Sequence, residues 1–91
     1  MEVKEIKNKV CSIVDENKNE IINLAKELFK HPEAGYKEKI TSAIIKDKFE
    51  KLDFEVEENI AITGIMTTIG NNKKPHIAVL GELDAIYNKD H

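Results

Sequence analysis

A stripe of apolar residues runs along the first third of the chain at helical spacing. It extends to Leu28, and lysine and glutamate residues stand between its members. A recurrence every three to four residues is typical of one face of an α-helix. Because the phase continues from Val14 through Ile21 to Leu28, the pattern favours a single helix over residues 3–30. A second helix that begins with Asp15 as its N-cap is the alternative.

A second helical stripe follows a short break. Proline excludes the residue before it from the α region, so His31-Pro32 is expected to end the first helix. Residues 32–35 then form a turn, and the pattern over residues 37–52 predicts a second helix. Its apolar side comprises Ile40, Ile44, Ile45, Phe49 and Leu52.

After residue 52 the hydrophobic period changes from helical to alternating. Phe54 and Val56 alternate with acidic residues, which is typical of a half-buried strand. Residues 62–69 are rich in β-branched side chains and predict a second strand, in which Gly64 indicates a bulge or a close backbone approach. Residues 76–83 predict a third strand. The turn-forming sequence before it favours an antiparallel hairpin of the last two strands.

This order of elements predicts an α/β or α+β unit, with two N-terminal helices packed on a small three-stranded sheet. Ninety-one residues make one small domain with a modest core. Residues 77–80 are apolar at successive positions, so both faces of that strand should be buried against other elements. We therefore expect further residues of the protein, or a partner chain, to pack on the sheet.

Composition and charge narrow the class of protein. The formal net charge is −3, and all 14 basic residues are lysine. Without the planar guanidinium group of arginine, and with a net acidic balance, nucleic-acid binding is not expected. No apolar run approaches the roughly 20 residues of a membrane span, and the N-terminus lacks an apolar signal core. Together with the single cysteine, Cys11, these features predict a cytoplasmic protein without membrane contact.

Two carboxylates at the end of the third predicted strand are the strongest candidates for chemistry. Glu82 and Asp84 are two positions apart, so both would point to the same side of an extended strand. Paired carboxylates suit a hard cation or general acid–base chemistry. From the spacing alone, a solvated strand end with Asp84 as an N-cap is the simpler explanation. His31 and Glu33 are another possible ligand pair, although a helix end followed by a turn explains them without chemistry. Neither His76 nor His91 has a neighbour at metal-ligand spacing, and Cys11 has no local histidine to activate it.

Several motifs together resemble the metal-dependent aminoacylase/carboxypeptidase superfamily. Residues 28–38, Leu-Phe-Lys-His-Pro-Glu-Ala-Gly-Tyr-Lys-Glu, and the Thr-Ser pair at 41–42 resemble its His-Pro-Glu-x-Gly-aromatic-x-Glu…Thr-Ser opening. Residues 52–56 are similar to its Leu-Gly-aromatic-x-Val strand entry, and residues 63–65 to its Thr-Gly-Val/Ile motif. Residues 78–86 resemble its strand that ends in acidic-x-Asp-Ala. The most similar branch comprises amidohydrolases such as indole-acetyl-amino-acid hydrolases and aminobenzoyl-glutamate utilisation proteins.

The resemblance implies a catalytic domain with two zinc or manganese ions that hydrolyses amide bonds of N-acyl amino acids or peptides. It implies a role for Asp84 in orienting the metal site, whereas Glu82 stands where wider superfamily members have a histidine ligand. The family's His-x-Cys-Gly-His ligands, Glu-Glu base motif and inserted dimerisation domain are absent from this sequence. We therefore expect residues 1–91 to be the truncated N-terminal portion of such a domain, inactive and without metal ligands or a cofactor of its own.

Two other interpretations stay open. In one, the chain is a small non-enzymatic module for interaction or oligomerisation. In the other, it is one half of a split enzyme whose second chain supplies the metal ligands. The apolar run over residues 77–80 motivates the first, since an uncovered strand favours pairing with other chains. The expected contact is through the exposed sheet, with a second copy or with the missing C-terminal part.

Overall fold

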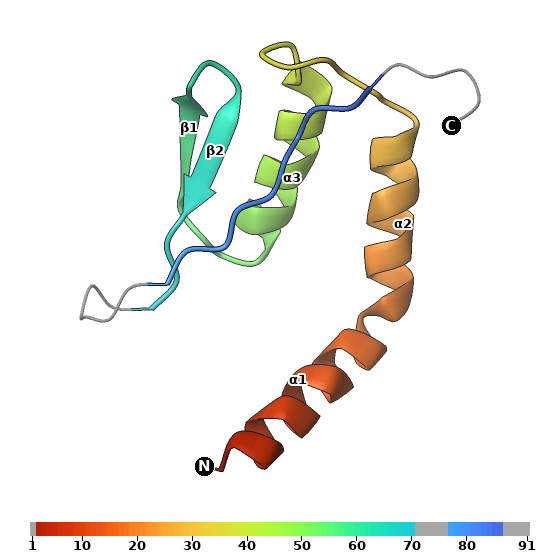
Figure 1. Cartoon of the computed structure of the whole chain (residues 1–91), viewed down its shortest axis with the longest axis vertical. Helices are drawn as coiled ribbons and strands as arrows, with labels where there is room; N and C mark the ends of the chain where they lie inside the picture. The colour runs from red at the N-terminus through yellow and green to blue at the C-terminus, as the bar shows by residue number, and fades with distance from the viewer. Residues whose placement is uncertain (1, 71–76, 87–91) are drawn as a thin grey trace. The chain divides into compact units, whose positions relative to one another are not determined.

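The computed structural model describes residues 2–70 and 77–86 of the chain (Figure 1). It divides into two compact units, one that ends at Lys30 and one that begins at His31. The first unit contains the helices α1 (Val3–Glu16) and α2 (Lys18–Phe29). The second contains helix α3 (Lys39–Lys51) and the strands β1 (Val56–Ile60) and β2 (Gly64–Thr67), which pair in an antiparallel sheet. The fold is of the mixed α+β kind that the sequence predicts.

The predicted single helix over residues 3–30 is wrong at one position. Asn17, with φ −101° and ψ 10°, leaves the helical region and separates α1 from α2. Its backbone N–H is shared between the carbonyl oxygens of Ile13 and Val14, and its side-chain Nδ2 donates to the Ile13 oxygen at 2.8 Å. Such local side-chain bonds compete with helix continuation. The alternative of two helices is therefore correct, although Asn17 and not Asp15 precedes α2.

The bounds of helix α3 agree with those of the predicted helix 37–52 to within two residues. The way in which α3 ends explains why the chain reverses its direction there. Asp53 N–H donates to the carbonyl oxygen of Glu50 at 2.9 Å, and Phe54 N–H to that of Phe49 at 3.1 Å. This pair of bonds is a Schellman motif, which places the residue after the cap in the left-handed region. Asp53 has φ 64° accordingly. Glycine adopts this conformation without the steric cost of a Cβ atom.

Substitution of this residue by glycine is expected to stabilise the chain. Asp53→Gly removes a left-handed conformation that costs an ordinary residue about 1–2 kcal/mol, and the more flexible unfolded chain offsets part of the gain. We expect the free energy of unfolding, measured by urea titration, to rise by about 0.5 kcal/mol. Asp53→Ala is the matched control, because it removes the carboxylate but keeps the Cβ atom. Equal gains from both variants would contradict this explanation.

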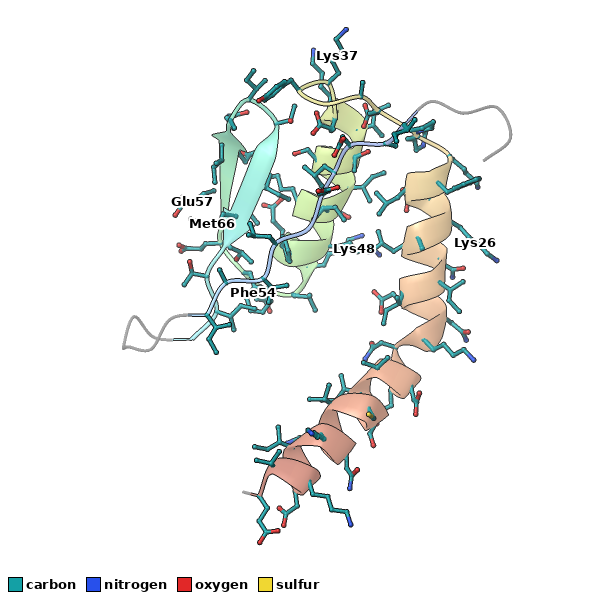
Figure 2. All side chains as sticks on the ribbon, viewed as in Figure 1. Lys26, Lys37, Lys48, Phe54, Glu57 and Met66 are labelled. Atoms are coloured by element: carbon teal, nitrogen blue, oxygen red, sulfur yellow. The ribbon has the colours of Figure 1, made fainter. Side chains whose placement is uncertain are left out.

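The strands β1 and β2 form a hairpin in which Gly64 lies against the backbone of Ile60. Glu57 pairs with Met66, as Figure 2 shows, and the register shifts between Glu57 and Ile60. A Cβ atom added at Gly64 would overlap the carbonyl oxygen of Ile60. The predicted close backbone approach at Gly64 is therefore confirmed.

Residues 77–83, the described part of the third predicted strand, do not form a strand. Residue 76 lies outside the described part of the chain. The sheet accordingly has two strands among the described residues, and the predicted three-stranded sheet is not observed there. The hairpin joins the first and second predicted strands instead of the second and third. A connection of only three residues, 61–63, separates β1 from β2, so little chain entropy is lost when they pair.

Helix α3 contacts both strands of the hairpin, which is the helix-on-sheet packing expected for this helix (Figure 1). An ion pair of 3.0 Å between Lys46 Nζ and Glu58 Oε1 joins α3 to β1. The hydrogen bond to Glu58 raises the pKa of Lys46, and the charges of Glu58 and Glu50 add to this effect. No apolar side chain in the described ranges is buried. None of the helices described has the length and apolar character needed to cross a membrane.

Candidate functional site

The second unit has an open pocket of about 310 Å³ where three stretches of chain meet. The first stretch is the loop before α3, the second is the connection between β1 and β2, and the third is residues 81–84. The residues that these stretches contribute are Gly35, Tyr36 and Glu38, then Ile60, Ala61, Thr63 and Gly64, and finally Gly81, Glu82, Leu83 and Asp84. The pocket therefore brings together segments that the sequence separates widely.

The side chain of Glu33 holds the loop before α3 by capping the helix. Its Oε1 accepts a hydrogen bond from Thr41 N–H at 2.6 Å, and its Oε2 accepts one from Ile40 N–H at 3.0 Å. Both N–H groups belong to the first turn of α3, where backbone donors lack an intrahelical acceptor. Thr41 is buried, and its hydroxyl donates to the carbonyl oxygen of His31 at 3.5 Å. A single carboxylate thus fixes the start of α3 to the His-Pro-Glu motif.

These contacts set the charge of Glu33. Partial burial alone would raise the pKa of its carboxyl group. The backbone N–H groups of Thr41 and Ile40, the Thr41 hydroxyl and the nearby His31 together outweigh burial, so the pKa of Glu33 lies below the ordinary value of 4.5. The ionised form is therefore the form that caps α3, which also suits the positive end of the helix dipole.

The main chain of Glu33 holds a second segment in place. Ala85 N–H donates to the carbonyl oxygen of Glu33 at 2.8 Å. Figure 1 shows the blue segment that contains Ala85 reaching the loop before α3. Since Ala85 directly follows Asp84, this bond anchors the Glu-Leu-Asp sequence beside the His-Pro-Glu loop.

Glu38 links the start of α3 to the hairpin. It is 8% exposed, and its Oε1 accepts a hydrogen bond from Thr63 Oγ1 at 3.2 Å. Thr63 follows two residues with positive φ, Ala61 at 48° and Ile62 at 79°. The left-handed turn thus directs the chain so that Thr63 reaches the buried carboxylate. This bond joins residues 28–38 to residues 63–65. In the sequence, only their resemblance to motifs of the same family connects these two stretches.

Both predicted acidic residues, Glu82 and Asp84, line the pocket and are exposed. They do not stand on a strand, so the geometric reason for their expected proximity does not apply. The role of Asp84 in orienting a metal site stays a prediction. Cys11 is exposed on α1, in the first unit. The other two histidines of the chain, at positions 76 and 91, lie outside the described residues.

The residues of this pocket do not fit a two-metal centre. Such a centre needs several histidine, cysteine, aspartate or glutamate ligands gathered in one cluster. In the part of the chain that the structure describes, no group of three or more of these side chains is placed to hold a metal ion. The pocket carboxylates Glu38, Glu82 and Asp84 are accordingly not gathered into such a group among the described residues.

The sequence did not reveal that Glu33 holds Thr41 at the start of α3, or that Thr63 lines the pocket and donates to Glu38. A capping box leaves a visible signal, because its acidic residue lies three positions after the cap. Glu33 instead precedes its two backbone donors by seven and eight positions. No short-range pattern reports such a contact. The only local signal is an acidic residue in a Pro- and Gly-containing loop directly before a predicted helix.

Comparison with known proteins finds partial relatives. Thermostable carboxypeptidase 2 of Saccharolobus solfataricus is 33% identical over 86 residues, which cover 92% of this chain and 21% of that protein. Two proteins of Arabidopsis thaliana, IAA-amino acid hydrolases ILR1-like 2 and ILR1-like 5, are 29% and 26% identical over 66 residues. Those residues cover 72% of this chain and 15% of each relative. The chain thus spans about a fifth or less of the length of these relatives.

No family model and no solved structure matches the chain. The relatives named above are all hydrolases or peptidases by name. Three of the segments that resemble an amide-hydrolase family in sequence, residues 28–38, 63–65 and 78–86, also contribute residues to one pocket in the second unit. The partial similarities therefore support a relationship of this chain to the aminoacylase/peptidase superfamily.

Proposed function

We propose that this chain forms the N-terminal part of the catalytic domain of a metal-dependent amide hydrolase acting on N-acyl amino acids or peptides. The observation that carries the proposal is the hydrogen bond from Ala85 N–H to the Glu33 carbonyl oxygen. It joins two of the segments that resemble the family, the His-Pro-Glu loop and the Glu-Leu-Asp segment. The similarity to a carboxypeptidase over 92% of the chain supports the same assignment.

In this proposal the 91 residues contribute the walls of the site and not its metal centre. Asp84 is the residue that would orient the metal site. The ligands for two zinc or manganese ions, and the general base, belong to other parts of the protein or to a second chain. The 91 residues alone are then inactive. We place the protein in the cytoplasm, since its cysteine usage suits a reducing compartment.

The first test is metal uptake by the purified 91-residue chain. Because two or three separated carboxylates do not enclose a dinuclear centre, we expect no tight stoichiometric binding of zinc or manganese in calorimetry. We also expect no hydrolysis of N-acyl amino acids when either metal is added. Tight uptake of two ions per chain, or turnover, would contradict the assignment of the metal centre to other residues.

A chimera tests the positive side of the proposal. In thermostable carboxypeptidase 2 of Saccharolobus solfataricus, the aligned stretch is replaced by the corresponding residues of this chain, which cover 21% of that protein. We expect the folded chimera to retain hydrolysis, and Asp84→Asn within it to abolish turnover. Glu57→Gln, on exposed β1, is the control that should leave turnover unchanged. The proposal would be overturned by a folded chimera without turnover, or by one whose turnover is unchanged by Asp84→Asn.

A second candidate function is a non-enzymatic interaction module, favoured by the exposure of one apolar segment. Ile77, Val79 and Leu80 are 89%, 95% and 94% exposed. Exposed apolar runs of this kind favour pairing with another chain. Sedimentation of the purified chain separates the two candidates. A stable dimer that Val79→Lys dissociates favours the module, whereas a monomer at all concentrations argues against it.

A further inference from the structure

We infer that Glu33 is a positioning residue, which couples the N-terminus of α3 to the Glu-Leu-Asp segment. Its consequence for catalysis rests on the proposed function, while the coupling itself concerns the folded chain alone. The inference joins two sets of contacts that different atoms of one residue make. The side-chain oxygens hold Ile40 and Thr41, and the main-chain oxygen holds Ala85.

The two sets of contacts depend on each other through the short loop that contains Glu33. The carboxylate fixes the loop at the helix start at 2.6 and 3.0 Å, and this fixation determines where the carbonyl oxygen points. Pro32 restricts the backbone directly before Glu33, because its ring fixes φ. The turn after it is closed by the hydrogen bond from Lys37 N–H to the Ala34 carbonyl oxygen at 3.0 Å. A loop stiffened on both sides transmits a displacement of the Glu33 side chain to its carbonyl group.

The anchored segment depends strongly on this one bond. Within the described residues 77–86, Ala85 is the residue that donates a backbone hydrogen bond, and most side chains there are exposed. Among the described residues 77–86, only Leu83 is half-buried. Loss of the Glu33 carbonyl from its present position therefore leaves little to hold Glu82 and Asp84 at the pocket. In the complete enzyme, Glu33 would set the place of Asp84 without touching substrate.

The charge of Glu33 makes the coupling sensitive to acid. Protonation turns a charged acceptor into a neutral carboxyl group, which binds the α3 amides less strongly. The charge of His31 on the same loop lowers the pKa of Glu33 further. The other charged groups on the segments joined here are Lys37, Glu38 and Lys39 at the start of α3, and Glu82 and Asp84 on the anchored segment. Glu33→Gln then separates Glu33 from the other carboxyl groups, which it leaves in place.

Hydrogen exchange of the full chain, read by NMR as protection factors of single amides, tests the coupling. In Glu33→Ala we expect the protection of Ala85 to fall together with that of Ile40 and Thr41, by roughly 5- to 30-fold. The amide of Met66 in the hairpin should keep its protection. Glu57→Ala is the matched control, since it removes an exposed glutamate from β1 and should change none of these amides.

A second experiment measures protection at falling pH. It compares the wild-type chain with Glu33→Gln, which keeps the shape of the side chain. Between about pH 5.5 and about pH 3 the protection of Ala85 should fall in the wild type and stay level in Glu33→Gln. Loss at Ile40 and Thr41 without loss at Ala85 would show that Glu33 only caps the helix, and would overturn the inference. Equal loss at Ala85 and Met66 would assign Glu33 to overall stability and would also overturn it. Neither result depends on whether the chimera hydrolyses a substrate.

Discussion

A chain that carries Gly64→Ala is expected to lose the pairing of β1 with β2, and with it one wall of the pocket. The new methyl group would overlap the carbonyl oxygen of Ile60, which is a backbone atom and cannot turn aside. Overpacking of this kind costs about 1–3 kcal/mol. No described apolar side chain is buried, so little other packing compensates for that cost. Urea unfolding followed by circular dichroism measures the loss, and the amide protection of Met66 locates it in the hairpin.

Gly35→Ala is the matched control for this substitution. A Cβ atom at Gly35 meets no atom within 4 Å, and the backbone there is outside the left-handed region. The free energy of unfolding should therefore stay level or rise by about 0.4–1 kcal/mol, because alanine restricts the unfolded chain. If Gly64→Ala and Gly35→Ala proved equally stable, the close approach to Ile60 would not be what requires glycine in the hairpin.

Acidification is expected to loosen the N-terminus of α3 before the hairpin separates. The pKa of Glu33 in the folded chain lies below 4.5, the value for an unperturbed carboxyl group. The folded state thus binds fewer protons than the unfolded state as the pH falls through this range. The stabilisation is complete above about pH 4.5 and is lost as the pH falls through the lower folded-state pKa. Loss of such a cap costs about 1–2 kcal/mol.

Far-UV circular dichroism between about pH 6 and about pH 3 measures this loss of helix. Glu33→Gln should show less helix than the wild type at pH 6 and a flatter acid profile, since its amide does not titrate. The raised pKa of Lys46 contributes nothing here, because that group stays charged throughout acid titration. Identical acid profiles of wild type and Glu33→Gln would show that other carboxyl groups cause the transition.

Much of the secondary structure was predictable because it depends on neighbours within a few residues. The spacing of apolar residues predicted α3 within two positions, and Pro32 predicted the end of the helix before it. Gly64 predicted a close backbone approach that the hairpin confirms. The break at Asn17 was missed because a single non-helical residue leaves the phase of the apolar stripe unchanged. Hydrophobic periodicity reports which face is apolar and is insensitive to such a local side-chain bond.

The candidate site was predictable only in part. The motifs containing Glu33 and Asp84 were visible in the sequence, and the relatives support the superfamily that those motifs resemble. Their meeting at one pocket was not visible, since the third strand, at whose end Asp84 was expected, is not formed by its described residues. A strand requires a partner, and the presence of a partner is not a property of the strand's own residues.

The sequence alone therefore specified the helical stripes, the turn residues and the acidic motif, because each follows from steric and hydrophobic preferences over a few positions. The tertiary structure decided that Glu33 caps α3 and receives Ala85, and that Glu38 receives Thr63. These contacts join residues that lie at least seven positions apart along the chain. They form only where folding brings a donor to an acceptor, and no local pattern encodes that approach.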